Sequence, residues 1–441
     1  MDRTTQYPHH LAHLVAERLR GDGGRLPPET VLTELLETLY FASLKSEQRR
    51  VFSTVSYLDP AEADREPPAR PPSDRPTPAR FERLLPFDVR TLQSLGRAVE
   101  PAVSSLAVYG DHKRGLFIWG MLDHEPPHAE SASLESSAAE WPEVFRVLVS
   151  GPGNLAVYCR GTLVASLVRN TLVEQYHNVL WAGPVHAILR ENLRAWLAEQ
   201  TGRRVGPGGE VAAAIAADRP PRPTDPDEDL MEEQFVDRAI NAVGRILAGI
   251  QRYRRGGGLL IVPHDSLDGL SVHYLLRYDR LPKALAGLVE SHLRRPRART
   301  AEQVAGCLTE LERRKSEVLR AIRFIAALSC AGGVVLLERG LGVRGFGAEI
   351  RVGDPLGDVF LAGDVRAGAT RLRRADVAHF GTRAQAVIRY CCQNPGSLAF
   401  VVSRDADVQA VTQLDGKVVL WENVDLQPGF DAEPVGPTQP N

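Results

Sequence analysis

A short turn in the C-terminal part of the chain carries residues that could bind a phosphate group. In "HFGTRAQAVIRYCCQNPGSLAFVVS" (379–403), Gly381, Thr382 and Arg383 stand together and open a helix-like run. The first N–H groups of a helix have no partner within it and form the positive end of its dipole. A hydroxyl and a guanidinium add directional donors that suit phosphate. Because Ala384 and Gln385 supply no acid, base or further cation, the turn predicts binding without obvious chemistry. A simple helix cap is the alternative interpretation.

The segments around this turn predict alternating helices and strands. An amphipathic helix (232–255) ends at Gly256–Gly257–Gly258, and "LLIVPHD" then begins a strand. Helices are expected at 281–294 and 300–328, followed by "GGVVLLERGLGVRGFGAEIRV" as two strands around a glycine-rich turn. "AQAVIRYCCQ" predicts a helix and "SLAFVVSRD" a strand. "QAVTQLDGKVVLWENV" predicts a hairpin with Asp415–Gly416 in a type I′ turn.

"GLGVRG" (340–345) matches the GxGxxG pattern of dinucleotide-binding loops. Such a loop must join a strand to a helix, so that the pyrophosphate meets the helix N-terminus. Both flanks here read as strands, so the sequence favours a hairpin. His9, His10 and His13 could share one helix face as metal ligands, but a solvated chain terminus is the favoured reading. Cys391–Cys392 on an apolar helix are expected in the core.

The N-terminal half is predicted to be a mixed α/β region. Helical spacing at 8–20 and 28–45 is followed by a strand at 50–58, and "LAVYG" (106–110) and "GLFIWGML" (115–122) predict a hairpin. The expected divisions of the chain are a helical segment and strand (1–58), a Pro-rich linker or loop (59–80), an α/β domain (81–203), a Pro-rich linker (204–229), an α/β domain (230–425) and a disordered tail (426–441). The fold class is therefore α/β.

Composition narrows the class of protein. The chain has 441 residues, of which 43% are hydrophobic and 24% charged, and 53 cationic against 55 acidic residues give a net charge of -2. This balance gives no electrostatic reason to expect nucleic acid or a membrane as partner. Five cysteines without a CxxC pair argue against a disulfide framework, and the first residues lack the apolar core of a signal peptide. A cytoplasmic location is expected.

The order of motifs from 232 to 425 resembles the diadenylate cyclase (DAC) domain family. "GGLLIV" (257–262) stands at that family's first strand, "AGGVVLLERGLGVRGFGAEI" (331–350) at its DGA hairpin and "GTRAQA" (381–386) at its GTRHRA motif. "FVVSRD" (400–405) and "VTQLDGKVVLW" follow at the VSEE strand and the closing hairpin. The resemblance implies a mixed central sheet flanked by helices, with a nucleotide pocket built from these motifs.

This chain departs from the family pattern at residues that the family uses for catalysis. The metal-binding aspartate of the family corresponds to Ala331, followed by Gly332 and Gly333, and the first glutamate of VSEE corresponds to Arg404. The histidine and second arginine of RHR correspond to Ala384 and Gln385. Phosphodiester formation needs a metal that activates the attacking hydroxyl and neutralises the phosphate. The resemblance therefore implies a pocket that binds a nucleotide without turning it over.

The N-terminal half resembles the DACNV group, bacterial proteins proposed to be nucleotide sensors. The segments that carry this resemblance are "LPPETVLTELLETLYFASLKSEQRRVFSTV" (26–55), "SSLAVYGDHKRGLFIWGMLD" (104–123) and "VLVSGPGNLAVY" (147–158). Both resemblances together imply a nucleotide sensor. The residues implied to bind the ligand are Gly381, Thr382, Arg383, Ala331, Gly332, Gly333 and Ser403.

The expected ligand is an adenine nucleotide or a cyclic dinucleotide, with an unidentified downstream protein as a further partner. No cofactor is required, although Mg²⁺ or Mn²⁺ could accompany a bound nucleotide. Diadenylate cyclases work as two facing sites, so a homodimer is an open expectation. One alternative is an active cyclase that uses relocated carboxylates, for which the candidates are Glu338, Glu349, Asp364, Asp376 and Asp405. The other is a protein-interaction platform without a ligand.

Overall fold

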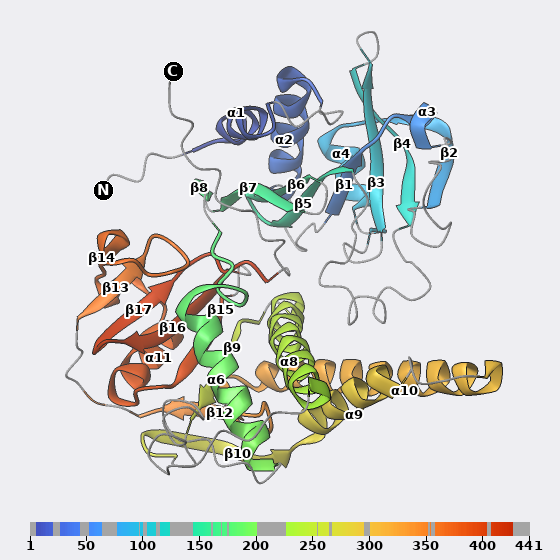
Figure 1. Cartoon of the computed structure of the whole chain (residues 1–441). Helices are drawn as coiled ribbons and strands as arrows, with labels where there is room; N and C mark the ends of the chain where they lie inside the picture. The colour runs from blue at the N-terminus through green and yellow to red at the C-terminus, as the bar shows by residue number, and fades with distance from the viewer. Residues whose placement is uncertain are drawn as a thin grey trace, which may run out of the picture. The chain divides into compact units, whose positions relative to one another are not determined.

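The computed structural model describes residues 6–20, 27–44, 53–63, 77–123, 144–200 and 226–426, with short breaks at 97, 100–103, 112–114, 160–161, 169, 174–175, 254, 264–266, 295–299, 352, 354–357 and 404–406. The chain divides into two compact units, Met1–Gln175 and Tyr176–Asn441 (Figure 1). Each unit contains one mixed β-sheet with helices packed on it, so the predicted α/β class is confirmed.

The described strands of the first unit form one sheet in the order β2-β4-β3-β1-β5-β6-β7-β8. The strands are β1 (Ser53–Tyr57), β2 (Thr77–Pro86), β3 (Ser104–Asp111), β4 (Gly115–Asp123), β5 (Phe145–Gly151), β6 (Asn154–Cys159), β7 (Thr162–Val168) and β8 (Thr171–Val173). The predicted hairpin at 106–122 is confirmed as β3–β4. β1 pairs in parallel with β3 and antiparallel with β5. The strand predicted within the 1–58 segment is confirmed as β1, and it lies inside this sheet.

Helices of the first unit pack on one face of that sheet. They are α1 (Pro8–Arg18), α2 (Glu29–Leu44) and α4 (Val89–Leu95), and the short α3 (Pro60–Ala63) follows β1. The apolar stripe of α2 is buried in the core with residues of β1, β3 and β5. The predicted linker at 59–80 is corrected at both ends. α3 occupies its start and β2 begins at Thr77, while 64–76 lies outside the described residues.

The second unit is built on a sheet whose described strands run in the order β10-β12-β11-β9-β15-β16-β17-β13-β14. The strands are β9 (Gly257–Val262), β10 (Leu270–Tyr278), β11 (Val334–Glu338), β12 (Val343–Ile350), β13 (Val359–Ala362), β14 (Leu372–Arg374), β15 (Leu398–Val402), β16 (Val408–Leu414) and β17 (Lys417–Trp421). β9 runs parallel to β11 and antiparallel to β15. Positive φ at Asp415 and Gly416 confirms the predicted type I′ turn of β16–β17. The sequence did not predict β10, β13 or β14.

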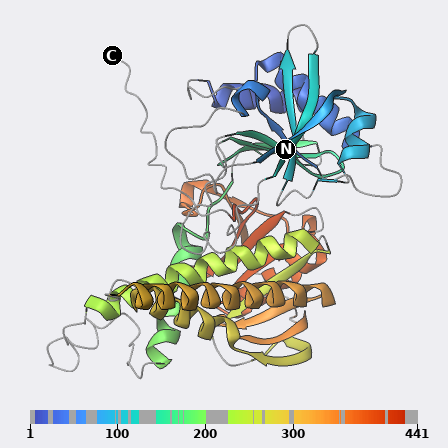
Figure 2. The same ribbon diagram turned by 90° about the vertical axis from the view of Figure 1, so that its right-hand side faces the viewer.

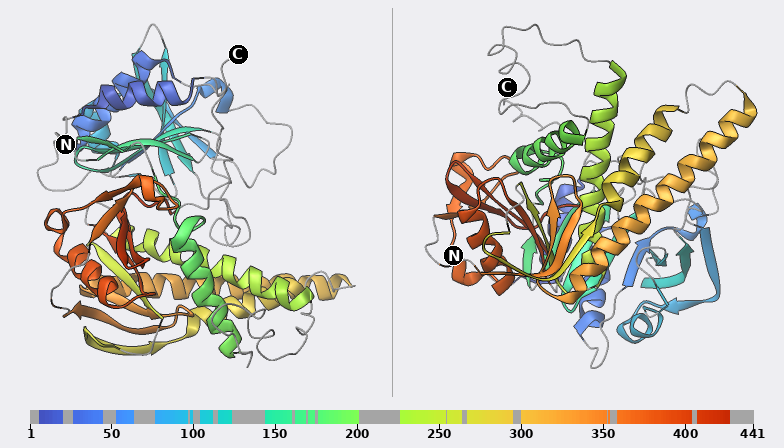
Figure 3. Two further views of the ribbon diagram at one scale, coloured as in Figure 1. Left: turned by 60° about the vertical axis from the view of Figure 1, so that its left-hand side comes forward. Right: turned by 90° about the horizontal axis from the view of Figure 1, so that it is seen from below.

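Helices cover both faces of this sheet. α8 (Pro226–Tyr253), α9 (Arg280–Arg294) and α10 (Ala301–Leu328) pack against one another, and Figure 2 shows α8 and α10 side by side across the sheet. Ile250 of α8 and Ser329, just after α10, approach β9 at Gly257. α11 (Thr382–Gln393) packs on the other face, where it shares an apolar core with Leu260, Val401 and Leu420 (Figure 3). The sheet therefore lies between α11 and the long helices.

One domain boundary differs from the sequence expectation. Helix α6 (Gly183–Gln200) belongs to the second unit rather than to the predicted 81–203 domain. Arg190 on α6 binds Glu233 on α8 at 2.6 Å, and Trp196 stacks on Phe235 with ring centroids 5.6 Å apart. The linker predicted at 204–229 also ends earlier, since α8 begins at Pro226. Residues 201–225 lie outside the described residues, and so does the expected tail at 426–441 apart from Leu426.

The "GLGVRG" glycines sit in the β11–β12 hairpin, as the sequence predicted. A β-carbon on Gly340 would come within 2.4 Å of the Trp196 ring, and one on Gly342 within 2.4 Å of the Glu338 carboxylate. A β-carbon on Gly345 would come within 2.4 Å of Val272. Close packing around a hairpin therefore explains the motif, and no helix follows it to receive a pyrophosphate.

Candidate functional site

Three chain segments meet at one end of the second sheet. Val402 of β15 pairs with Gly257 of β9, and Val335 of β11 pairs with Leu259. The pairing of β9 with β11 is parallel, so two residues before Leu259 and Val335 it places Gly333 beside Gly257. Ser403 directly follows the end of β15. The sequence-predicted residues at 331–333 and 403 are therefore neighbours across this sheet end.

The side chain of Arg383 reaches the same end from α11. Its Cδ lies 3.6 Å from the position that a β-carbon would take on Gly258. That position is also 3.0 Å from the carbonyl oxygen of Phe400 on β15 and from Cγ1 of Val334 on β11. Because Gly258 has no side chain, the aliphatic part of the Arg383 side chain can pass over it. The structure brings Arg383 to the segments that carry Gly333 and Ser403.

The first turn of α11 contributes backbone donors. Gly381 is the N-cap, with φ -63° and ψ 155°, and it has no side chain to cap the helix. Gly381 and Thr382 are exposed, and no acidic residue lies in the first turn. Gln385 does not offer its amide here, because its Nε2 donates to the Phe380 carbonyl at 2.8 Å. An anion at this turn would meet the positive end of the helix dipole without a competing carboxylate in that turn.

The turn before β11 exposes main chain. A 3-10 turn (Ser329–Ala331) follows α10, and Gly332 and Gly333 then adopt φ of 86° and 63°. A β-carbon on Gly333 would lie 2.6 Å from the Ala348 carbonyl oxygen, whereas one on Gly332 would meet nothing within 4 Å. Ala331 is exposed. This turn can present backbone to a ligand, while Ala331, Gly332 and Gly333 add no charged side chain.

Ser403 closes the turn between β15 and β16. Its backbone N–H donates to the Asp407 carbonyl at 2.8 Å, and its Oγ accepts from the Asp407 N–H at 3.0 Å. The hydroxyl proton of Ser403 is then the group that it can offer to a ligand. Arg404 and Asp405, which follow Ser403 in the sequence, lie outside the described residues.

The described candidate carboxylates are spread over the unit. Glu338 lies at the far end of β11 from Gly333, and Glu349 on β12 contacts His273 at 3.5 Å. Asp364 accepts from the Gly368 N–H at 3.1 Å, and Asp376 caps a 3-10 turn by accepting from the Ala378 N–H. Within the described ranges, no group of three His, Cys, Asp or Glu side chains has the arrangement of a metal site.

Other residues weighed in the sequence also have defined surroundings. His10 accepts from the Tyr7 N–H at 3.0 Å, and His13 lies 3.0 Å from Glu29. Cys391 is fully buried, as predicted, and this burial raises the pKa of its thiol to about 12. Cys391 is therefore a protonated core residue at neutral pH.

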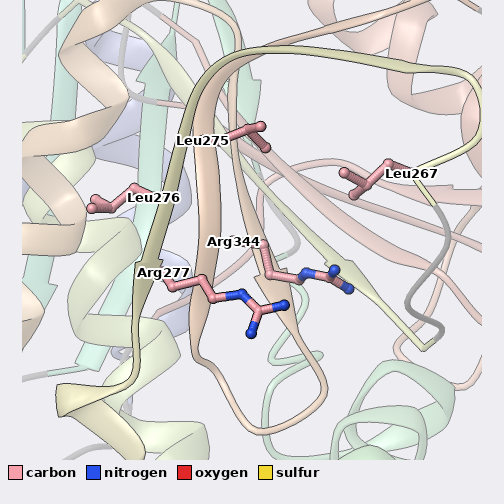
Figure 4. A pocket seen from close by; sticks show the side chains of 5 residues that line it. All are labelled: Leu267, Leu275, Leu276, Arg277 and Arg344. Carbon is pink, nitrogen blue, oxygen red and sulfur yellow. The ribbon is translucent and has the colours of Figure 1, made fainter.

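Two open cavities lie elsewhere in the second unit. Their volumes are about 290 and 270 Å³, and Arg277 on β10 and Arg344 on β12 line both of them. Figure 4 shows the larger one. Neither is lined by Arg383 or by the turn at 331–333. Sequence reasoning missed Arg277 because it did not predict β10, and missed Arg344 because the irregular pairing of β12 depends on two other strands. Arginine is also too common in this chain to mark a site by itself.

Comparison with protein families identifies one segment of the chain. Residues 22–123 match the family described as the probable sensor domain DACNV. This segment is similar to the DACNV family. It runs from before α2 to the last residue of β4, so it supplies the half of the first sheet that contains β1 to β4. The expected resemblance to this family is confirmed there.

The DACNV match ends before β5, so β5 to β8 complete the sheet from outside the matched segment. Searches of curated proteins and of solved structures found no match. None of the helices in the described part of the chain combines the length and apolarity needed to cross a membrane.

Proposed function

We propose that this protein is a cytoplasmic nucleotide sensor whose second unit binds an adenine nucleotide or a cyclic dinucleotide at the Arg383 end of its sheet. Arg383, Thr382 and the backbone of Gly381 would hold phosphate. The backbone at 331–333 would line the base or ribose side, and Ser403 would donate its hydroxyl proton. The match of residues 22–123 to the probable sensor domain DACNV supports the sensor role.

The main support for this proposal is that the side chain of Arg383 lies over Gly258. A guanidinium at a helix N-terminus, next to glycine-rich backbone, provides the directional donors and positive potential that a phosphate group requires. The order of the surrounding motifs, which resembles that of diadenylate cyclases, supports the same ligand class.

Two described positions at this end of the sheet lack the chemical groups that a cyclase carries. Ala331 and Gln385 occupy positions where the resembled family has a metal-binding aspartate and a second arginine. Strand alternation also directs Glu349 away from Arg383. Its neighbour Ala348 belongs to the core on the α11 side, so the two side chains point to opposite faces. We therefore propose binding without turnover, with Mg²⁺ or Mn²⁺ present only when the nucleotide brings it.

Calorimetric titration of the full chain with ATP and with cyclic di-AMP tests the proposal. Arg383→Ala should weaken binding by at least ~1.5 kcal/mol, because a charged hydrogen bond contributes about that much. Arg374→Ala is the matched control, since Arg374 is exposed on β14 and pairs with Asp358 at 2.6 Å. Equal affinity in both variants would reject the Arg383 site. Formation of cyclic di-AMP from ATP and Mn²⁺ would instead favour an active cyclase.

A further inference from the structure

The β10–β12 ladder holds a second set of phosphate-binding groups that the proposed nucleotide site does not use. Arg277 and Arg344 come from these neighbouring strands and line both cavities of the second unit. Figure 4 shows both side chains extending toward the same open side of the ladder. Arg277 is exposed and Arg344 is half-buried. Two guanidiniums that share one open cavity provide a fork for an anion with more than one negative charge.

Strand irregularities set the position of Arg344. On the β10 side, Leu275 pairs with Gly345 and Tyr278 with Val343, so two residues of β10 face Arg344 alone. On the β11 side, Leu336 pairs with Gly345 and Leu337 with Val343, so Arg344 is the extra residue. Such bulges bend a strand and redirect its side chains, and they occur often beside binding sites.

The cavity of about 290 Å³, called the first cavity, suits an anion better than the second. Its described lining combines the two arginines with Leu267, Leu275 and Leu276, and none of these five residues carries a carboxylate. Leu275 is 73% exposed, which leaves an apolar surface next to the guanidiniums. The second cavity is lined by Asp279 and Glu338. Asp279 is paired with Lys283 at 2.5 Å, and the Glu338 carboxylate lies over Gly342 in the hairpin turn.

This location is separate from the proposed nucleotide site. Arg344 lies beside Leu336 and Leu337, three or four residues along β11 from Gly333. At about 3.3 Å per residue, that is roughly 10–13 Å along the strand, and Arg277 is one strand further out. Along the strand, the position of Arg277 and Arg344 is therefore displaced from the turn at 331–333.

We propose that Arg277 and Arg344 form a second anion site, which binds the di- or triphosphate group of a phosphate ester. Leu267 and Leu275 would contact the apolar part of that ligand. Two guanidiniums match the charge of a polyphosphate better than that of a single carboxylate. Binding there would depend strongly on salt, because the site is open to solvent.

Calorimetric titration with tripolyphosphate, at 50 and 200 mM salt, tests the second site in the full chain. Arg277→Gln and Arg344→Gln should each weaken one binding event by about tenfold or more. Arg374→Gln removes the same charge at β14 and should leave that event unchanged. Arg277→Lys, which keeps the charge but loses the fork, should give an intermediate loss. Circular dichroism of each variant checks that the fold is kept.

The Arg383→Ala background separates this site from the proposed function. If both sites exist, wild type binds two equivalents, Arg383→Ala binds one, and adding Arg277→Gln removes the other. If the Arg383 site is wrong, wild type binds one equivalent that only the Arg277 and Arg344 variants abolish. The proposal would be overturned if Arg374→Gln lost as much affinity as Arg277→Gln and Arg344→Gln. It would also be overturned if the Arg277 and Arg344 variants kept wild-type affinity. Absence of tripolyphosphate binding at millimolar concentration would also overturn it, and would leave the β10 edge to a protein partner.

Discussion

The Cδ of Arg383 lies 3.6 Å from the point where Gly258 would carry a β-carbon. Arg383 is on α11, whereas Gly258 is the second residue of β9, more than a hundred positions earlier in the chain. The absence of a side chain on Gly258 therefore determines where the arginine can lie. This relationship connects the glycine run after α8 with the phosphate-binding turn.

Substitution of Gly258 by alanine should disturb this arrangement. The new methyl group would lie 3.0 Å from the Phe400 carbonyl oxygen and from Val334. Overpacking of this kind costs about 1–3 kcal/mol of folding free energy. We expect Gly258→Ala to lower the urea midpoint and to weaken nucleotide binding. Gly306→Ala is the control, because that helix position has nothing within 4 Å, and it should stabilise by roughly 0.5–1 kcal/mol. Equal midpoints for the two variants would contradict the tight packing at Gly258.

Gly333 should tolerate alanine less well than another glycine with positive φ. Its φ is 63°, and an added β-carbon would lie 2.6 Å from the Ala348 carbonyl oxygen. Gly416 has φ 76° but nothing within 4 Å, so Gly416→Ala measures the backbone strain alone, about 1–2 kcal/mol. Gly333→Ala should cost clearly more in urea unfolding. Similar losses in both variants would show that β12 does not approach Gly333 this closely.

Acid should destabilise the second unit through His177. Burial lowers the pKa of this imidazole, while the nearby Asp364 carboxylate opposes that effect. The unfolded chain therefore binds a proton more readily, near its ordinary pKa of about 6.5. The stability that neutral His177 contributes is fully present above that pH. It is lost as the pH falls toward the lowered pKa of His177 in the folded protein.

The test for His177 compares urea unfolding at pH 7.0 and 5.5. Wild type should lose more stability over this interval than His177→Gln, which cannot titrate. Glu233, whose pKa is lowered by hydrogen bonds from Arg190, is present in both proteins and cancels in the comparison. Identical pH slopes would show that His177 is not held in its neutral form.

Local patterns predicted much of the fold. The apolar stripe of α2 and the Asp415–Gly416 turn are properties of neighbouring residues, and both are confirmed. β10 was missed because Tyr274 and Leu275 are exposed at the sheet edge, so its strand lacks a clear apolar alternation. α6 was assigned to the wrong unit because its partner α8 follows the long segment 201–225, and helix periodicity does not identify a distant partner.

The candidate site was predicted only as separate motifs. The order of the motifs named Arg383, Gly333 and Ser403, and strand pairing brings their segments together. Gly258 could not be assigned a role, because that role depends on the packing of α11 over the sheet. Arg344 could not be found either, since its position depends on irregular pairing with two other strands.

Thermal unfolding against a ligand panel tests the nucleotide-sensor proposal most directly. Wild type and Arg383→Ala would be scanned with ATP, cyclic di-AMP and other cyclic dinucleotides, with and without Mn²⁺. A ligand at 100 times its dissociation constant adds about 2.7 kcal/mol, enough to raise the midpoint by several degrees. We predict such a rise for at least one ligand in wild type and its loss in Arg383→Ala. A flat panel in wild type, or a rise that persists in Arg383→Ala, would contradict nucleotide binding at Arg383.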